Sequence, residues 1–408
     1  MYQTLYRPVQ AILKPIHRRI SLNRILLKGL GGGRPNRKGR ALVSFITGYA
    51  AYLTEQHSKA IWDDANRLQL AIDDTLNGKY ARHALHVWSV DLIRQLINAG
   101  FVVDAIYDRS GYLLEDVGQY DVIIDEWTNM ERWGKQNPAA KKWYFAVAAH
   151  WLFWNRAEME RVNWLFQRRN VLVLPERQLA PHRGLEQADM ISYVGNEFIH
   201  DTFGVFRPKL QKIQATSTLI SRIRPKKDWA SAKKRFIYFG STGWVHRGLD
   251  LVIEAFLRLD YPLLICGGDD GFLQIYGEQI EESPNIEHVG FVIPDSTQFH
   301  QLMQASGSVV YASSAEGCST SILQCMQFGL IPLVTLACGQ DIHHLVPPIV
   351  GDDDEALITN MMTQCQAIAQ SSDAECEALS SAIWEYALEN HSHEAYSASL
   401  KTAMTTLL

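Results

Sequence analysis

The sequence contains no run of eighteen or more apolar residues, so we expect no transmembrane helix. Its amino terminus lacks the apolar core and the cleavage site that mark a secretory signal peptide. The six cysteines all lie in the second half of the chain, and none belongs to a Cys-x-x-Cys pair. This usage suits a reducing cytosol, so the sequence predicts a cytoplasmic protein.

Acidic residues are absent from the first forty residues, which contain ten Lys or Arg, although the whole chain has a net charge of -5. The rest of the chain is therefore acidic and offers no nucleic-acid motif, which argues against nucleic acid as a partner. We predict a basic N-terminal arm over residues 1–40. If a helix starts near Pro15, one side of it is apolar, comprising Leu13, Ile16, Ile20 and Leu27.

This arm has two interpretations, which the sequence leaves open. An imperfectly amphipathic basic helix could bind an anionic membrane surface, which would place the protein peripherally at the inner face of the cell membrane. A flexible arm, or a helix packed on the first domain, explains the same pattern equally well.

The length of 408 residues, with 47% of them hydrophobic, allows two globular domains. Apolar spacing predicts a helix over residues 83–99, and β-branched runs predict strands at residues 41–46, 101–107, 121–125, 143–148, 171–174 and 190–194. A polar, irregular stretch at residues 49–80 interrupts this alternation. Helices between strands are typical of a parallel sheet, so we predict a Rossmann-like first domain over residues 41–220.

The stretch from Tyr311 to Thr335 is the most informative part of the second half. It predicts a buried strand, a turn, a helix that starts near Ser319 and ends at Gly329, and another strand. Loops at the carboxyl ends of parallel strands hold ligands, and the free amides at a helix start attract phosphate. A carboxylate at Glu316 would suit the hydroxyl groups of a sugar attached to that phosphate. Glu316 is also explained as an ordinary first-turn acid favoured by the helix dipole, and this alternative stays open.

This segment resembles the signature of the retaining glycosyltransferases of the GT-B fold, in particular the large family 4 (group 1). Residues 236–250, 262–268 and 285–292 resemble further stretches of the family in the family's order, so the resemblance covers roughly residues 235–341. It implies an α/β fold with two Rossmann-like domains that face each other across a cleft. The donor domain would span residues 233–385, and a C-terminal helix at 386–408 would cross back to the first, acceptor domain. The first half also looks like a set of bacterial surface-polysaccharide glycosyltransferases.

The resemblance implies three catalytic residues. Glu316 would position the sugar hydroxyls, Arg247 would balance the charge on the diphosphate, and His150 would lie near the donor sugar. His150 is flanked by aromatic residues, so a packed histidine is an equally good interpretation. The donor-binding residues that the resemblance implies are Gly240, Ser241, Gly290, Phe291, Val292, Gly317, Cys318, Ser319, Thr320 and Gln324.

The chain departs from the family pattern at three places. Ser241 stands where the family has an arginine, so Arg247 is the one obvious cation left for the diphosphate. Gln324 replaces the second glutamate of the Glu-x7-Glu motif, which leaves an amide to hold the ribose. Gly329 and Pro332 are one residue further apart than in the family's Gly-x-Pro.

The function implied is transfer of a sugar from a nucleotide sugar to a glycan or lipid-linked acceptor, with retention of configuration, in polysaccharide or glycoconjugate biosynthesis. We expect no metal and no cofactor, because Arg247 and backbone amides would balance the charge on the leaving group. The acidic runs at residues 125–126 and 352–354 are interpreted as solvated rather than metal-binding.

Several alternatives remain. The chain could be a catalytically degraded GT-B protein that binds a nucleotide sugar or an assembly partner without transfer, and Ser241 and Gln324 are the features that favour this. An epimerase or phosphorylase on the same fold ranks lower. His83 and His86 are weaker candidates for acceptor or phosphate contacts.

Overall fold

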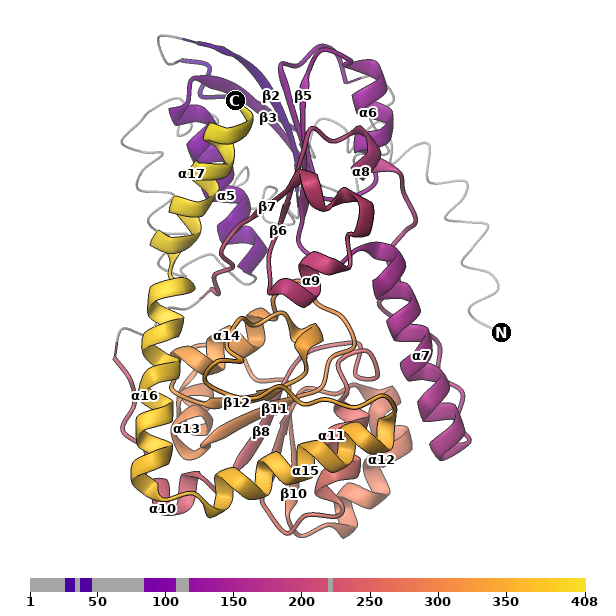
Figure 1. The fold of residues 1–408 in the computed structure, drawn as a ribbon, viewed down its shortest axis with the longest axis vertical. Coiled ribbons are helices and arrows are strands. Elements are labelled where there is room, and N and C mark those ends of the chain that lie inside the picture. Colours follow the sequence, from indigo (N-terminus) through magenta and orange to yellow (C-terminus); the bar gives the residue numbers. More distant parts are fainter. Residues whose placement is uncertain (1–25, 34–36, 46–83, 108–116, 219–222) are drawn as a thin grey trace. The chain divides into compact units, whose positions relative to one another are not determined.

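The computed structural model describes residues 26–33, 37–45, 84–107, 117–218 and 223–408, which form an α/β structure with two sheets (Figure 1). The chain divides into two compact units. The first comprises residues 1–145, 182–192 and 400–408, and the second comprises residues 146–181 and 193–399. The expected arm up to residue 25, the polar stretch at 49–80 and His83 lie outside the described residues, as does the side chain of His86.

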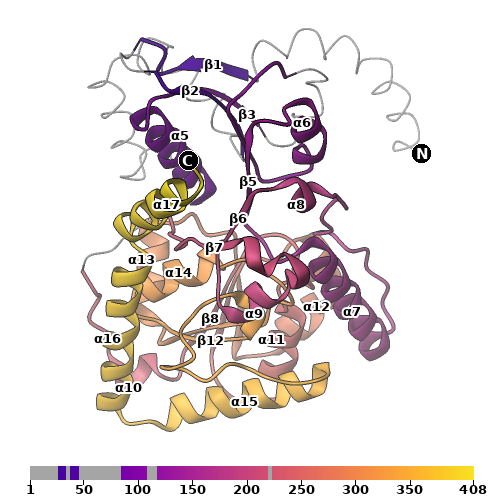
Figure 2. The same cartoon turned by 45° about the horizontal axis from the view of Figure 1, so that its top comes forward.

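The first sheet has the strand order β1-β3-β2-β4-β5-β6-β7. Strands β2, β3, β4 and β5 pair in parallel, and β1 pairs antiparallel with β3. Helices α5 (Ala84–Asn98) and α6 (Met130–Gln136) lie on opposite sides of this sheet (Figure 2). The strands are β1 (Leu26–Leu30), β2 (Gly39–Phe45), β3 (Phe101–Tyr107), β4 (Val122–Asp125), β5 (Lys141–Ala146), β6 (Met190–Tyr193) and β7 (Leu210–Lys212).

Two expectations for this half are wrong. The apolar side of the expected leader helix included Leu27, but Leu26–Leu30 is the edge strand β1. The run at residues 171–174 is not a strand, and its Leu172 and Leu174 side chains are exposed. This run follows Asn170, whose left-handed backbone ends the preceding helix, so the chain leaves that helix as an extended strap instead.

The second sheet is fully parallel, with the strand order β10-β9-β8-β11-β12. Strands β8, β9, β11 and β12 are short, mostly apolar runs, as expected for a parallel sheet that is covered on both faces, whereas the edge strand β10 includes Glu287 and His288 and is partly exposed. The strands are β8 (Phe236–Phe239), β9 (Leu263–Cys266), β10 (Ile286–Gly290), β11 (Ser308–Tyr311) and β12 (Ile331–Val334).

Helices cover both faces of the second sheet. In both views α11 (Leu249–Phe256) and α12 (Asp270–Glu282) lie on one side, and α13 (Thr297–Ala305) and α14 (Thr320–Gln327) on the other (Figures 1 and 2). The remaining helices and turns are α7 (Trp151–Arg169), α8 (Gly184–Gln187), α9 (Glu197–Asp201), η2 (Gly204–Lys209), α10 (Trp229–Ala232), η3 (Leu336–Cys338), α15 (Asp354–Gln370), α16 (Asp373–Asn390) and α17 (His393–Leu407). Among the helices that the structure describes, none is long and apolar enough to cross a bilayer.

His391 ends α16 and is fully enclosed within the second unit. Its Nδ1 donates to the carbonyl of Ala215 at 2.8 Å, and its own carbonyl accepts from the Thr216 hydroxyl at 2.8 Å. Burial lowers the pKa of His391 to about 4, and Lys212 adds to this effect. The imidazole is therefore neutral in the folded chain at neutral pH.

This buried histidine makes the fold sensitive to acid. The ordinary pKa of histidine is about 6.5, so between this pH and pH 4 His391 binds a proton in the unfolded chain but stays neutral in the folded chain. The contribution of neutral His391 to the free energy of unfolding is therefore complete above about pH 6.5 and decreases as the pH falls from 6.5 to 4. The free energy of unfolding should drop by about 1.4 kcal/mol per pH unit from this residue alone. Urea unfolding at pH 7, 6 and 5 should show a smaller drop in His391→Asn, which keeps a donor for Ala215. An unchanged slope would contradict this, and exposed His300→Asn serves as the control.

Candidate functional site

The topology of the second sheet identifies one edge as a ligand site. Strand β8 comes first in the chain, and its neighbours β9 and β11 lie on opposite sides of it. The connections at the carboxyl ends of β8 and β11 therefore diverge, and open α/β sheets bind ligands at such a switch point. The loops that begin there are residues 240–248 and residues 312–319, and both lie within the second compact unit.

Glu316 and Arg247 meet between these two loops. Arg247 Nε lies 3.8 Å from Glu316 Oε1, and both side chains are largely buried. The hydroxyls of Tyr311 and Ser313 each lie 3.4 Å from the same Glu316 oxygen. Burial by itself would lower the pKa of Arg247, but Tyr311 and Glu316 outweigh it and raise that pKa, so the guanidinium stays charged.

Two buried tyrosines, Tyr238 on β8 and Tyr311 on β11, stand beside this ion pair with ring centroids 5.3 Å apart. Burial raises the pKa of both phenols, so both stay neutral. The Tyr238 hydroxyl is enclosed and has no hydrogen-bond partner among the described residues. From the sequence, both tyrosines are expected only as core residues of their strands. The one sequence feature that could have indicated a role in the site is a hydroxyl near the carboxyl end of each strand.

His246 joins the two loops. Its Nε2 donates to the carbonyl of Ala315 at 2.6 Å, and its backbone carbonyl accepts from Ser314 N at 2.8 Å. Burial, followed by the charge of Arg177, lowers the pKa of His246 well below the ordinary value, so the ring is a neutral donor. His246 therefore fixes Arg247, the next residue, against the loop that carries Glu316.

Gly317 lies where several backbone segments cross. The pair Ala148 and Gly317 forms an isolated antiparallel bridge, and Ala149 N donates to Glu316 O at 3.0 Å. A Cβ on Gly317 would lie 2.3 Å from the carbonyl oxygen of Val147. Glycines at 195 and 339 approach Gly317 O just as closely, because a Cβ on either would lie within 2.3 Å of it. No side chain fits at this crossing, which holds the Glu316 backbone in place.

His150 follows this bridged segment. It precedes α7, where its Nδ1 accepts a hydrogen bond from Leu152 N at 3.2 Å, and its ring packs against Phe203 and Phe206. Burial lowers the pKa of His150. Its Nε2 makes no hydrogen bond with any residue in the described ranges, so helix capping leaves one ring nitrogen for another role.

Two groups of expected donor residues lie at the ends of strands β8 and β10. Gly240 and Ser241 follow β8, and Ser241 is exposed. Gly290 ends β10, and of the two residues that follow it Phe291 is 73% exposed and Val292 is buried. Phe291 therefore presents a free aromatic face, while Val292 belongs to the core.

At the helix start after Gly317, more polar groups form hydrogen bonds within the protein than expected. Ser319 is the residue before α14, but its side chain makes no capping hydrogen bond, and its amide donates to Cys338 O at 2.9 Å. Cys318 is buried, which raises the pKa of its thiol to about 12 and makes it a poor nucleophile. Thr320 opens α14, and Gln324 donates to the Thr218 hydroxyl at 2.7 Å.

The acidic run at residues 125–126 is not solvated, contrary to expectation. Asp125 is fully buried and accepts from the amides of Asn129 and Met130 at 2.8 Å each, so it caps the start of α6. In the other run Asp352 and Asp353 are exposed, and Asp353 caps α15. Among the described residues no three His, Cys, Asp or Glu side chains gather in a way that could hold a metal ion.

Residues 220–341 match the family model of glycosyl transferases group 1. The chain resembles the solved structure of HepE from Anabaena in complex with UDP-glucose at a TM-score of 0.52 and 12% identity, over 90% of this chain and 100% of that one. It resembles HepE in complex with UDP and glucose at a TM-score of 0.50 and 12% identity, over 77% and 89% of the two chains. No curated protein sequence matches the chain. Together with the two sheets, these likenesses show that the chain has the GT-B fold.

Proposed function

We propose that the protein is a glycosyltransferase that moves a sugar from a nucleotide sugar to a glycan or lipid-linked acceptor. The observation that carries this proposal is the buried pair of Glu316 and Arg247 at the switch point of the second sheet, 3.8 Å apart. The match of residues 220–341 to group 1 glycosyl transferases supports the reaction class. The HepE structures, which contain UDP-glucose or UDP and glucose, support a uridine nucleotide as the first donor to test.

Each residue of the pair has one task in this proposal. Arg247 balances the negative charge that develops on the diphosphate as the sugar leaves, and its raised pKa keeps it a permanent cation. Glu316 accepts hydrogen bonds from sugar hydroxyls, because a carboxylate is an acceptor and repels phosphate. Gln324 and the backbone from Gly290 to Val292 are assigned to the ribose and the base.

The reaction retains the anomeric configuration in this proposal. The acceptor hydroxyl forms a bond to the anomeric carbon on the face from which the diphosphate departs, and the carbon–oxygen bond to the phosphate breaks. The departing phosphate oxygen takes the hydroxyl proton, so no protein nucleophile is needed. The buried, largely protonated thiol of Cys318 agrees with that assignment. His150 is assigned to the donor sugar through its Nε2.

The acceptor side of the proposal rests on the sequence. The first forty residues contain ten Lys or Arg and no acid, and five of the ten precede strand β1; such a basic N-terminal segment fits an anionic membrane surface, where a lipid-linked acceptor would be found. Polysaccharide or glycoconjugate biosynthesis is the corresponding process.

A thermal-shift panel tests the donor assignment. UDP, GDP, ADP and their common sugar conjugates should include one nucleotide family that raises the melting temperature, because ligand bound to the folded state stabilises it. Glu316→Ala should lose the extra shift given by the sugar conjugate and keep the shift given by the nucleoside diphosphate. No shift with any compound would contradict the proposal. A shift without acceptor-dependent release of nucleoside diphosphate would favour a binding protein that does not transfer sugar.

A further inference from the structure

Arg177 reaches the loop after β8 from a distant part of the chain. It lies in the strap that follows α7, and its side chain runs directly over Gly243, where an added Cβ would lie 2.3 Å from Arg177 Cδ. The guanidinium carbon lies 5.5 Å from the ring centroid of Trp154, and that ring lies 4.4 Å from His246. Arg177 is therefore next to the segment that carries His246 and Arg247.

The backbone of the strap is fixed to α7. Glu158 accepts from Arg177 N at 2.8 Å and from the Gln178 amide at 2.7 Å, and Trp154 Nε1 donates to Arg177 O at 2.6 Å. Asn155 forms a pair of hydrogen bonds with the backbone of Leu179, each 2.8 Å long. These contacts hold Arg177 at one position along the helix.

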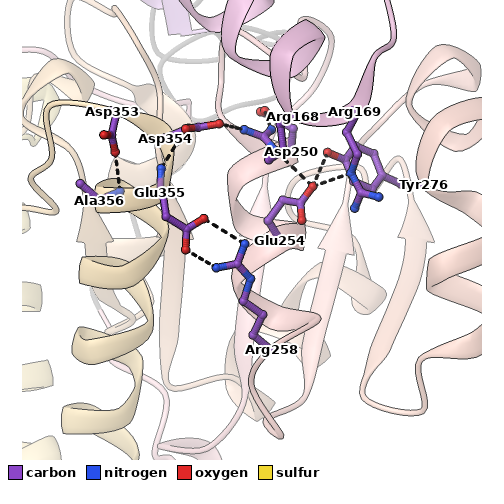
Figure 3. A network of polar contacts seen from close by, with 10 residues as sticks. All are labelled: Arg168, Arg169, Asp250, Glu254, Arg258, Tyr276, Asp353, Asp354, Glu355 and Ala356. Carbon is purple, nitrogen blue, oxygen red and sulfur yellow. Dashed lines mark hydrogen bonds and ion pairs between the residues drawn. The ribbon is translucent and has the colours of Figure 1, made fainter.

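Helix α7 is in turn fixed to the helices around the second sheet (Figure 3). Arg168 donates to Asp250 on α11 at 2.6 Å and also pairs with Asp354 on α15. Arg169 donates to Glu254 at 2.7 Å and lies over the ring of Tyr276 on α12. Hydrogen bonds thus join the strap to α7, and partly buried ion pairs join α7 to α11 and α15, so the strap and the loop after β8 keep a fixed relation.

The guanidinium of Arg177 has no anionic partner in the described part of the chain. Its Nε is enclosed and makes no hydrogen bond, and Glu158 on α7 already accepts hydrogen bonds from the strap. Burial and the charge of Arg247 lower the pKa of Arg177, while Glu316 raises it, so these three charges act on one another. A largely enclosed guanidinium whose Nε lacks a hydrogen-bond partner is costly unless an anion binds it.

We infer that Arg177 is a second guanidinium for the diphosphate of the donor and works together with Arg247. The loop from Gly240 to His246 contains no Lys or Arg, and in this inference Arg177 supplies the missing cation from outside the loop. Gly243 serves the arrangement, because any side chain at this position would displace Arg177. A planar guanidinium bonds two phosphate oxygens at once, so two of them suit a diphosphate. This inference rests on the proposed function.

Binding of UDP, UMP and uridine to Arg177→Gln, Arg177→Lys and the native chain tests the inference. By titration calorimetry, Arg177→Gln should weaken UDP binding by about tenfold or more, which corresponds to about 1.4 kcal/mol, and leave uridine binding unchanged, since only the charge-assisted hydrogen bonds to the diphosphate are lost. Arg177→Lys should recover part of the loss. The matched control is Arg183→Gln, which removes the same charge from an exposed arginine paired with Glu186.

The outcomes separate the inference from the proposed function. Native-like UDP binding by Arg177→Gln would overturn the inference and leave the donor site standing. An equal loss of affinity for UDP and for uridine would also overturn it, because Arg177 would then stabilise the fold of the site rather than bind the diphosphate. If GDP or ADP is the nucleotide that binds, the same series is measured with its own monophosphate and nucleoside. A native chain that binds no nucleoside diphosphate would overturn both.

Discussion

Replacing Glu316 with Gln should lower sugar transfer by at least about a hundredfold, which corresponds to about 2.7 kcal/mol of transition-state stabilisation. The side chain keeps its size but loses its charge and one acceptor oxygen, so the hydrogen bonds to the sugar hydroxyls weaken. Binding of nucleoside diphosphate should stay close to native, because Arg247 loses the acidic partner that it has among the described residues and stays free to bind phosphate. Steady-state kinetics together with titration of UDP measure both quantities.

The matched control is Glu282→Gln, which changes an exposed acid at the end of α12. It should leave transfer and UDP binding at native levels. Transfer by Glu316→Gln at the native rate would contradict the assignment of this carboxylate to the sugar. An equal loss of UDP binding and transfer would also contradict it, since Glu316 would then act through the fold.

Replacing Gly317 with Ala should destabilise the protein by about 3 kcal/mol, the upper range for overpacking a tight site. The added methyl group would lie 2.3 Å from the carbonyl oxygen of Val147 and 2.9 Å from the Val194 side chain. The backbone on either side must move to admit it, and Glu316 would move with Gly317. Urea unfolding should therefore show the loss of stability, and transfer by the folded protein should fall as well.

Gly277→Ala is the control for this substitution. Gly277 lies within α12, and a Cβ there meets nothing within 4 Å. Alanine should stabilise this helix by roughly 0.5–1 kcal/mol, because glycine loses more backbone freedom on folding. If Gly317→Ala unfolds at the same urea concentration as the native protein, the backbone around Gly317 can admit a methyl group and the predicted overpacking is wrong.

The second sheet follows from the sequence because its determinants are local. Four of its strands, β8, β9, β11 and β12, are short and mostly apolar runs between turn residues, and Gly329 has the left-handed backbone that separates α14 from β12. The same locality makes Glu316 and Arg247 recognisable, since each sits in a short motif beside a strand end. Their mutual approach to 3.8 Å then follows from the parallel pairing of β8 and β11.

The contacts that complete the site depend on tertiary structure. Val147 and Gly317 are 170 positions apart, and nothing near either residue indicates that they meet. The run from Val171 to Leu174 has strong strand propensity, but Asn170 and the side chains of α7 direct the chain along the helix as a strap. Arg177 and Arg247 are 70 positions apart in the sequence, and only the fold brings the Arg177 side chain beside the loop that leads to Arg247. Secondary-structure propensity and motif spacing cannot predict contacts between residues so far apart in the sequence.

The position of the diphosphate in a crystal of this protein grown with UDP tests the donor site most directly. Phosphate oxygens should lie about 2.7–3.2 Å from the guanidinium of Arg247, between the loops at residues 240–248 and 312–319. A nucleotide bound away from both loops, with Arg247 still paired only with Glu316, would contradict the account.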